Sequence, residues 1–289
     1  MRMSVGLLFA QLLNGVAIGM LYALLAFGLS IIKGLLNIPN FAHGALFAVG
    51  AYVSYAVARA SGSFWLGLIA APVVVGLVGL VIERVGVRRL YGSAYLFQLL
   101  LLFGVALILQ EVIIIIWGPV GQSMSPPAAL AGAVDIGITL FPRYLAFTTL
   151  ASALIISLVW LLIQKTRYGA VIRAGIEKKE MVSALGIDVD RLFTAAFGLG
   201  AALAGLAGAF AVPVVGATTA MGADMLAIAF VVVVLGGLGS IYGAILAGLL
   251  VGIVQSLAAL WVPAASTVMI YVAMVLVLWI RPQGLLGER

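Results

Sequence analysis

Few residues of this chain could do chemistry, and their spacing matches none of the common catalytic sites. The chain has no cysteine, which excludes disulfides, thiol catalysis and thiolate metal sites. The only histidine, His43, stands outside any His-Glu-x-x-His pattern, and no plausible Ser–His–Asp set or paired carboxylates accompany it. No Gly-Lys dipeptide occurs, so a Walker A phosphate loop is absent. The sequence therefore predicts a chain that is not an enzyme, binds no metal or cofactor and does not hydrolyse ATP by that route.

A small set of polar residues could instead line a path through a membrane. Polar side chains at membrane depth need partners or water, which makes them functional candidates. We predict a substrate pathway at Asn37, Asn40, His43 and Glu111. Glu111 has a structural alternative, which is pairing with Gln98 or Gln110, and His43 could likewise serve packing alone.

One long charged segment, residues 164–191, interrupts an otherwise apolar chain. It carries six of the 15 Lys and Arg residues and four of the nine Asp and Glu residues. Residues 177–185 have the pattern of a short amphipathic helix that Gly186 would end, and an aspartate after it could cap the next helix. Such a helix either lies on the lipid surface or docks in a groove on a soluble partner that supplies energy.

The elements that must position these residues are membrane-spanning helices. Charged residues make up only 8% of the chain, against about 25% in a soluble domain, and the mean hydropathy is +1.30. Apolar runs recur along the whole length, which predicts an all-α polytopic membrane protein with a single transmembrane domain over residues 1–289. The nine predicted spans are 6–32, 41–58, 64–82, 95–117, 144–163, 192–212, 224–238, 241–260 and 265–280.

Glycines predict where these helices break and where they pack closely. Gly236, Gly237 and Gly239 can end a helix, because each glycine costs about 1 kcal/mol in a helix interior. An eight-span alternative treats this break as a re-entrant dip, because 224–238 is short for a full crossing. A second glycine-rich run, 198–208, lets backbones approach closely, either within one subunit or between subunits.

The basic residues predict the orientation. With the N-terminus outside and the C-terminus in the cytoplasm, all but three of the 15 lysines and arginines are cytoplasmic. The exceptions are Arg2, Arg59 and Arg143. The net charge of +6 is therefore assigned to cytoplasmic loops beside the membrane, and nucleic-acid binding is not expected.

Five segments spread over nearly the full length resemble a known family. They are Gln11–Gly15 with Tyr22–Leu24, Asn40–Gly44 with Gly50–Tyr52, Thr166–Ala170 through Arg173-Ala174 to Ala184–Asp188, Gly236–Ser240 with Gly243-Ala244, and Arg281–Leu285. In this order and spacing the chain resembles the first-subunit permeases of branched-chain amino-acid ABC importers, the LivH-type proteins.

The resemblance implies partners, a location and a coupling site. The partners are a second, LivM-like permease, two cytoplasmic ATPases that hold ATP and Mg, and a periplasmic binding protein, all at the bacterial inner membrane. It implies that a cytoplasmic helix transmits ATP-driven closure, which assigns ATPase coupling to Arg173, Glu177, Met181, Val182, Leu185, Gly186 and Asp188. The cargo would be a branched-chain or related amino acid, although the family also includes carriers for urea, short amides and aromatic acids.

Two other classes of transport protein fit the sequence less well. A self-contained secondary transporter needs a coupling-ion site or proton relay at membrane depth, for which Glu111 alone is a poor candidate. A gated channel should show a polar pore lining, and none is visible in the spans. An importer permease explains both the missing ATP site and the charged segment.

Overall fold

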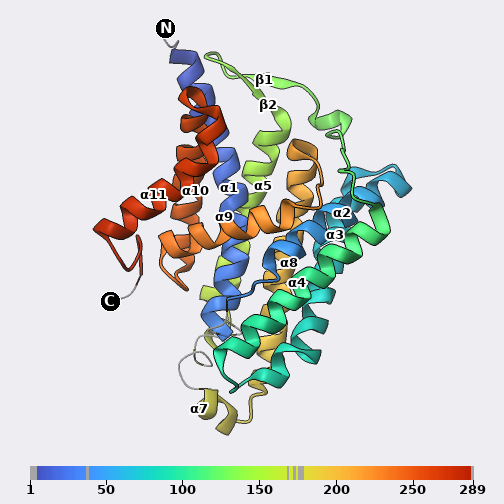
Figure 1. Cartoon of the computed structure of the whole chain (residues 1–289), viewed down its shortest axis with the longest axis vertical. Coiled ribbons are helices and arrows are strands. Elements are labelled where there is room, and N and C mark those ends of the chain that lie inside the picture. Colours follow the sequence, from blue (N-terminus) through green and yellow to red (C-terminus); the bar gives the residue numbers. More distant parts are fainter. Residues whose placement is uncertain (1–4, 37–38, 168, 172–173, 175–178, 288–289) are drawn as a thin grey trace.

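The computed structural model describes residues 5–36, 39–167, 169–171, 174 and 179–287, which form a bundle of helices (Figure 1). The long helices are α1 (Val5–Leu36), α2 (His43–Ser61), α3 (Phe64–Val85), α4 (Tyr95–Trp117), α5 (Arg143–Lys165), α8 (Val189–Val215), α9 (Met221–Gly236), α10 (Ile241–Trp261) and α11 (Ser266–Ile280). The short elements are α7 (Lys179–Ala184), η1 (Val87–Leu90), η2 (Ala128–Leu130), η3 (Pro263–Ala265) and the strands β1 (Ala133–Asp135) and β2 (Leu140–Pro142).

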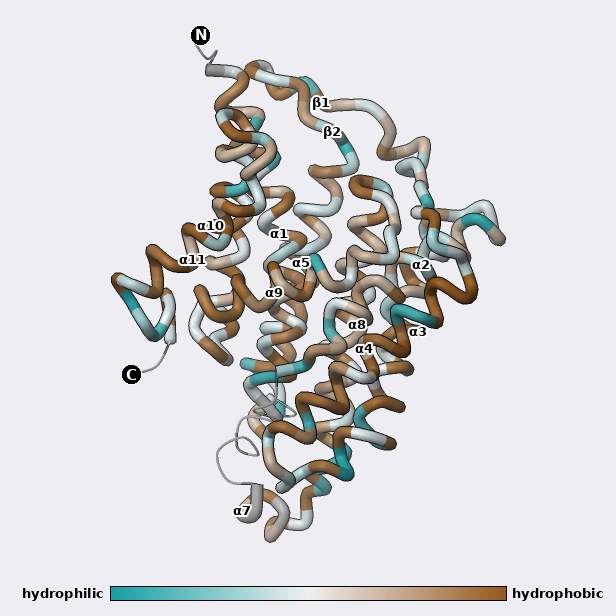
Figure 2. The backbone as a smooth tube through the Cα atoms, in the orientation of Figure 1, coloured by the Kyte–Doolittle hydropathy of each residue, from teal (hydrophilic) through white to brown (hydrophobic). Residues whose placement is uncertain are grey.

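Each predicted span coincides with a helix in the described part of the chain, which confirms an all-α membrane protein. Within that part, seven helices are long and apolar enough to cross a membrane. The two long helices outside this group are α2 and α9, and α9 has only 16 residues. Figure 2 shows hydrophobic residues predominating along α3 and α4.

The centre of the bundle is built on α1, α2 and α8, whose backbones touch through glycine. A methyl group added at Gly50 of α2 would lie 2.2 Å from the carbonyl oxygen of Gly205 in α8. One added at Gly208 would lie 2.0 Å from the carbonyl oxygen of Phe47. No side chain fits in these contacts, so small residues permit this approach of the helices. The glycine-rich run 198–208 therefore serves packing within the subunit.

The short helix α9 lies across the bundle and is held at both ends by glycine contacts (Figure 1). Near its start, a methyl added at Gly44 of α2 would meet the carbonyl oxygen of Gly222 at 2.0 Å. At its end, a methyl added at Gly236 would meet the carbonyl carbon of Gly243 in α10 at 2.3 Å. Gly44 and Gly243 each lie in the first turn of their helix, so the backbone of α9 contacts the backbone of another helix at each end.

A break separates α9 from α10 at the glycines predicted to end a helix. Helix α9 ends at Gly236, and Gly237 and Gly239 have φ angles of +101° and +89°, which other residues rarely adopt. The C-terminal segment folds back onto this break. The N–H groups of Leu285 and Leu286 donate to the carbonyl oxygens of Leu235 and Gly236, at 2.7 and 3.1 Å. These bonds satisfy carbonyls that the end of a helix leaves without partners.

The two ends of the bundle differ in character. The β1–β2 hairpin lies at the end near the N-terminus, and its strands pair antiparallel with Val134 opposite Phe141. Helix α7 lies at the opposite end, beside the start of α8 (Figure 1). Between the ends, α3, α4, α5 and α11 expose many large apolar side chains. A soluble monomer rarely exposes so much apolar surface, so these faces suit lipid or other subunits.

Candidate coupling and translocation sites

The charged segment contains the short helix α7, which has one buried side and one exposed side. Val182 of α7 is buried in the main hydrophobic core, whereas Met181 and Leu185 are 59% and 75% exposed. One side of this turn is therefore anchored in the bundle, and two apolar side chains face outward. Of the other predicted coupling residues, Arg173 and Glu177 lie outside the described residues.

The turn from α7 into α8 has the predicted local structure. Gly186 has a φ of +80°, in the left-handed region that suits glycine, and it ends the helical stretch. Asp188 is the N-cap of α8, where its carboxylate accepts from the Arg191 N–H at 3.0 Å. The Arg191 side chain also pairs with this carboxylate at 2.8 Å. Gly186 thus ends the first helical stretch, and Asp188 begins α8.

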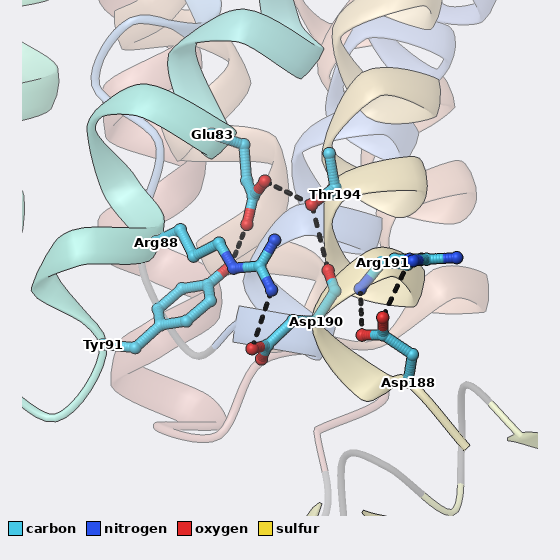
Figure 3. Close-up of polar contacts among 7 residues, drawn as sticks. All are labelled: Glu83, Arg88, Tyr91, Asp188, Asp190, Arg191 and Thr194. Carbon is cyan, nitrogen blue, oxygen red and sulfur yellow. Dashed lines mark hydrogen bonds and ion pairs between the residues drawn. The ribbon is translucent and has the colours of Figure 1, made fainter. Parts of the chain in front are cut away.

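Two residues further on, an ion pair ties α8 to the turn after α3. Arg88 of η1 and Asp190 in the first turn of α8 pair at 3.0 Å, with about one third of each side chain exposed (33% and 35%) (Figure 3). Ion pairs this open to solvent contribute little to stability. The pair instead defines where the end of the charged segment meets the bundle.

Behind this pair, a buried carboxylate joins three elements. Glu83, in the last turn of α3, is fully buried and accepts a hydrogen bond from the Tyr91 hydroxyl at 2.6 Å (Figure 3). Its other oxygen accepts from the Thr194 hydroxyl of α8, one turn after Asp190. Burial, and then the bond to Glu83, raise the pKa of the Tyr91 phenol, which therefore stays protonated and donates.

We call the set Glu83, Arg88, Tyr91, Asp190 and Thr194 the coupling junction. Sequence reasoning missed it, because its two members on α8 lie about 100 residues along the chain from the other three and meet them only when α3 packs on α8. One signal was available: a carboxylate at the end of a predicted span needs a hydrogen-bond donor when it is buried. The sequence alone does not say which residue supplies it.

Two predicted pathway residues lie at the start of α2. Asn40 and His43 are both fully buried. The Asn40 side chain accepts from the Ala42 N–H at 3.0 Å, and Nε2 of His43 donates to the Leu25 carbonyl of α1 at 2.9 Å. Within the described residues, Nδ2 of Asn40 and Nδ1 of His43 are buried without a hydrogen-bond partner. This buried region thus contains two polar atoms that could hydrogen-bond to another molecule.

The other two pathway predictions have different outcomes. Asn37 lies outside the described residues. Glu111 is exposed on α4 and faces away from the bundle, whereas Asn40 and His43 are enclosed by it. The structure therefore brings Asn40 and His43 together and keeps Glu111 apart from them. Gln98 donates to the Leu90 carbonyl at 2.7 Å, so the pairing of Glu111 with Gln98 is not observed among the described residues.

Comparison with known proteins identifies the family. Residues 11–278 match the family described as branched-chain amino acid transport system / permease component. The chain is 31% identical to the high-affinity branched-chain amino acid transport system permease protein LivH of Escherichia coli (strain K12), over 96% of this chain and 95% of that protein. It is 30% identical to the high-affinity branched-chain amino acid transport system permease protein BraD of Pseudomonas aeruginosa, over 96% of this chain and 95% of that protein.

A second kind of relative also matches. The chain is 30% identical to the permease protein LivM of Escherichia coli (strain K12), over 92% of this chain and 68% of that protein. No solved structure matches the chain. The resemblance inferred from the motifs is confirmed over nearly the whole length, and the chain belongs to the branched-chain amino acid transport permease family.

Proposed function

We propose that this chain is a transmembrane permease subunit of an ABC importer for branched-chain or related amino acids. It forms part of the translocation path, and partner subunits hydrolyse ATP. The named relatives support the cargo class, and the missing phosphate-binding loop in the sequence supports a role without catalysis.

The orientation in the bacterial inner membrane places α7 in the cytoplasm. Lysines and arginines concentrate in the segment around α7, which supports this assignment. Nine crossings then put the N-terminus outside and the C-terminus inside. Helix α9, with 16 residues or about 24 Å, is short against a hydrocarbon core of about 30 Å. In the eight-span alternative, the break after α9 only dips into the membrane.

One observation carries the coupling role of the charged segment. Helix α7 buries Val182 in the bundle, and Met181 of α7 and Leu185 directly after it are exposed, which is the arrangement of an amphipathic helix that docks in a groove on a partner. We propose that a cytoplasmic ATPase supplies this groove. The coupling junction then carries movement of the segment into α3 and α8, because Asp190 and Thr194 of α8 hold Arg88 and Glu83 on the other side.

The full assembly follows from this role. It comprises this chain, a second LivM-like permease, two ATPases that bind ATP and Mg, and a periplasmic substrate-binding protein. For the path itself we propose the region around Asn40 and His43, whose unused polar groups adjoin the end of α9 held by Gly44. A change in the tilt of α9 would open or close this region.

Two alternatives make different predictions. The same importer could carry urea, a short amide or an aromatic acid, in which case only the cargo assay changes. A self-contained secondary transporter would instead take up cargo without ATPases.

The test is purification of this chain, tagged, from membranes that express its neighbouring subunits, followed by mass spectrometry. Two ATPases and a second permease in the same particle support the proposal. A clean homo-oligomer that takes up cargo alone contradicts it and favours the secondary transporter.

A further inference from the structure

Helix α4 is attached to the bundle by one side only. It packs on α2 and η1, and its buried residues are Gln98, Leu102 and Ile113. The opposite side is exposed, with Leu100 at 56% and Leu107 at 52%. Most of this exposed side is apolar and would suit lipid as well as protein.

Glu111 makes lipid a poor environment for this side of α4. At 3.6 residues per turn, Glu111 lies roughly 180° round the helix from the centre of the buried side. No hydrogen bond or ion pair within the described residues reaches its carboxylate. It lies six residues before the end of the helix at Trp117, or about 9 Å along the axis. A carboxylate at this depth that faces acyl chains is costly, so such residues usually face protein or water.

A glycine on the same side gives independent evidence for a neighbouring helix. Gly104 lies two turns before Glu111 and within about 20° of it round the helix. A methyl group added at Gly104 would have nothing within 4 Å, so this glycine does not serve packing within the chain. In membranes, small residues on a helix surface allow a second helix to approach closely. The flanking Leu100 and Leu107 would then pack beside that helix.

We propose that the outward face of α4, defined by Leu100, Gly104, Leu107 and Glu111, is the contact surface for the second, non-identical permease of the importer. That subunit places a basic or hydrogen-bond-donating side chain opposite Glu111. The inference rests on the proposed function, because it takes its partner from the importer.

A second copy of this chain fits the surface less well. The basic residues of its described long helices lie in the first or last turn of their helices. They are Lys33, Arg59, Arg84, Arg143, Lys165 and Arg191. Each lies within three residues of a helix end, whereas Glu111 lies six residues from the end of α4. A second copy therefore offers no basic residue as far inside a helix as Glu111, which favours a non-identical partner.

Photo-crosslinking in the assembled complex tests the surface directly. A photo-reactive phenylalanine analogue replaces Leu107 on α4, and the control replaces Leu154 on α5, which is 60% exposed. We expect Leu107 to crosslink to the second permease and Leu154 to give mainly lipid adducts. Crosslinks from Leu107 to a second copy of this chain, or to lipid alone, would overturn the proposal.

Substitution of Glu111 tests the charge. Glu111→Lys should lower recovery of the second permease with the tagged chain by about tenfold or more, because unmatched charge at a buried contact is costly. Glu111→Gln, which still accepts a hydrogen bond, should lower it much less. Gel filtration of the variants alone tests whether they remain folded. Unchanged recovery with Glu111→Lys would refute the contact, even if uptake were lost.

These outcomes separate the surface from the proposed function. Recovery of ATPases and a second permease with crosslinks from α4 only to lipid leaves the importer standing and removes this surface. A wild-type chain that recovers no second permease overturns both.

Discussion

Replacing Thr194 by valine removes one of the two hydroxyl groups that donate to the buried carboxylate of Glu83. Valine keeps the shape of threonine, so the main loss is the hydroxyl, which lies against Glu83 and also 2.9 Å from the Asp190 carbonyl oxygen of its own helix. Bonds to charged groups contribute about 1.5–3 kcal/mol, and Glu83 is fully buried, so screening by solvent does not reduce this figure. We expect the free energy of unfolding to fall by about 1.5–3 kcal/mol.

Reversible unfolding in mixed micelles, followed by the fluorescence of the chain's five tryptophans, measures this loss. The matched control is Thr148→Val in α5, where a buried hydroxyl donates only to the Leu145 carbonyl of its own helix. A neutral bond of this kind contributes about 1 kcal/mol.

A double-mutant cycle isolates the charge. In a Glu83→Gln background the bond to Thr194 becomes neutral, so Thr194→Val should cost about 1 kcal/mol less there than in the wild type. Equal losses in both backgrounds, or a loss no larger than that of Thr148→Val, would refute the account of the coupling junction. The same variant should lower cargo-stimulated ATP hydrolysis more than basal hydrolysis in the assembled importer.

Three further predictions concern coupling and packing. Val182→Pro should abolish cargo-stimulated ATP hydrolysis while membrane insertion stays intact, since proline disrupts α7, and normal stimulation would contradict the docking role. Arg88→Asp should impair stimulated hydrolysis, and adding Asp190→Arg should restore it; failure of the double variant to recover would show that the pair does not act in coupling. Gly44→Ala should destabilise the chain by about 1–3 kcal/mol, because its methyl would lie 2.0 Å from a backbone oxygen of α9. Gly104→Ala has open space and serves as the control in the isolated chain, where a thermal scan should show no loss.

Local features of the fold could be predicted because their causes lie in adjacent residues. Gly186 ends a helical stretch with a positive φ, and Asp188 caps α8 through the N–H three residues later. The break at Gly236 likewise follows from a cluster of glycines. Apolar runs locate each span to within a few residues, because the membrane demands long apolar helices.

Long-range features of the site could not be predicted from the sequence. Glu83 and Thr194 are 111 residues apart, and their contact depends on how α3 packs on α8. The direction in which Glu111 points depends on which side of α4 is buried, and a helix that is apolar all round gives no such signal. The functional roles of the proposed pathway and coupling residues stay predictions.

The most direct test of the importer role is uptake of radiolabelled leucine into proteoliposomes that contain the purified complex. The binding protein is supplied on the face opposite the ATPases, and ATP on the face that the ATPases occupy. We predict uptake that requires ATP and binding protein and is lost with Val182→Pro. Uptake by this chain alone, driven by an ion gradient without ATP, would contradict the account.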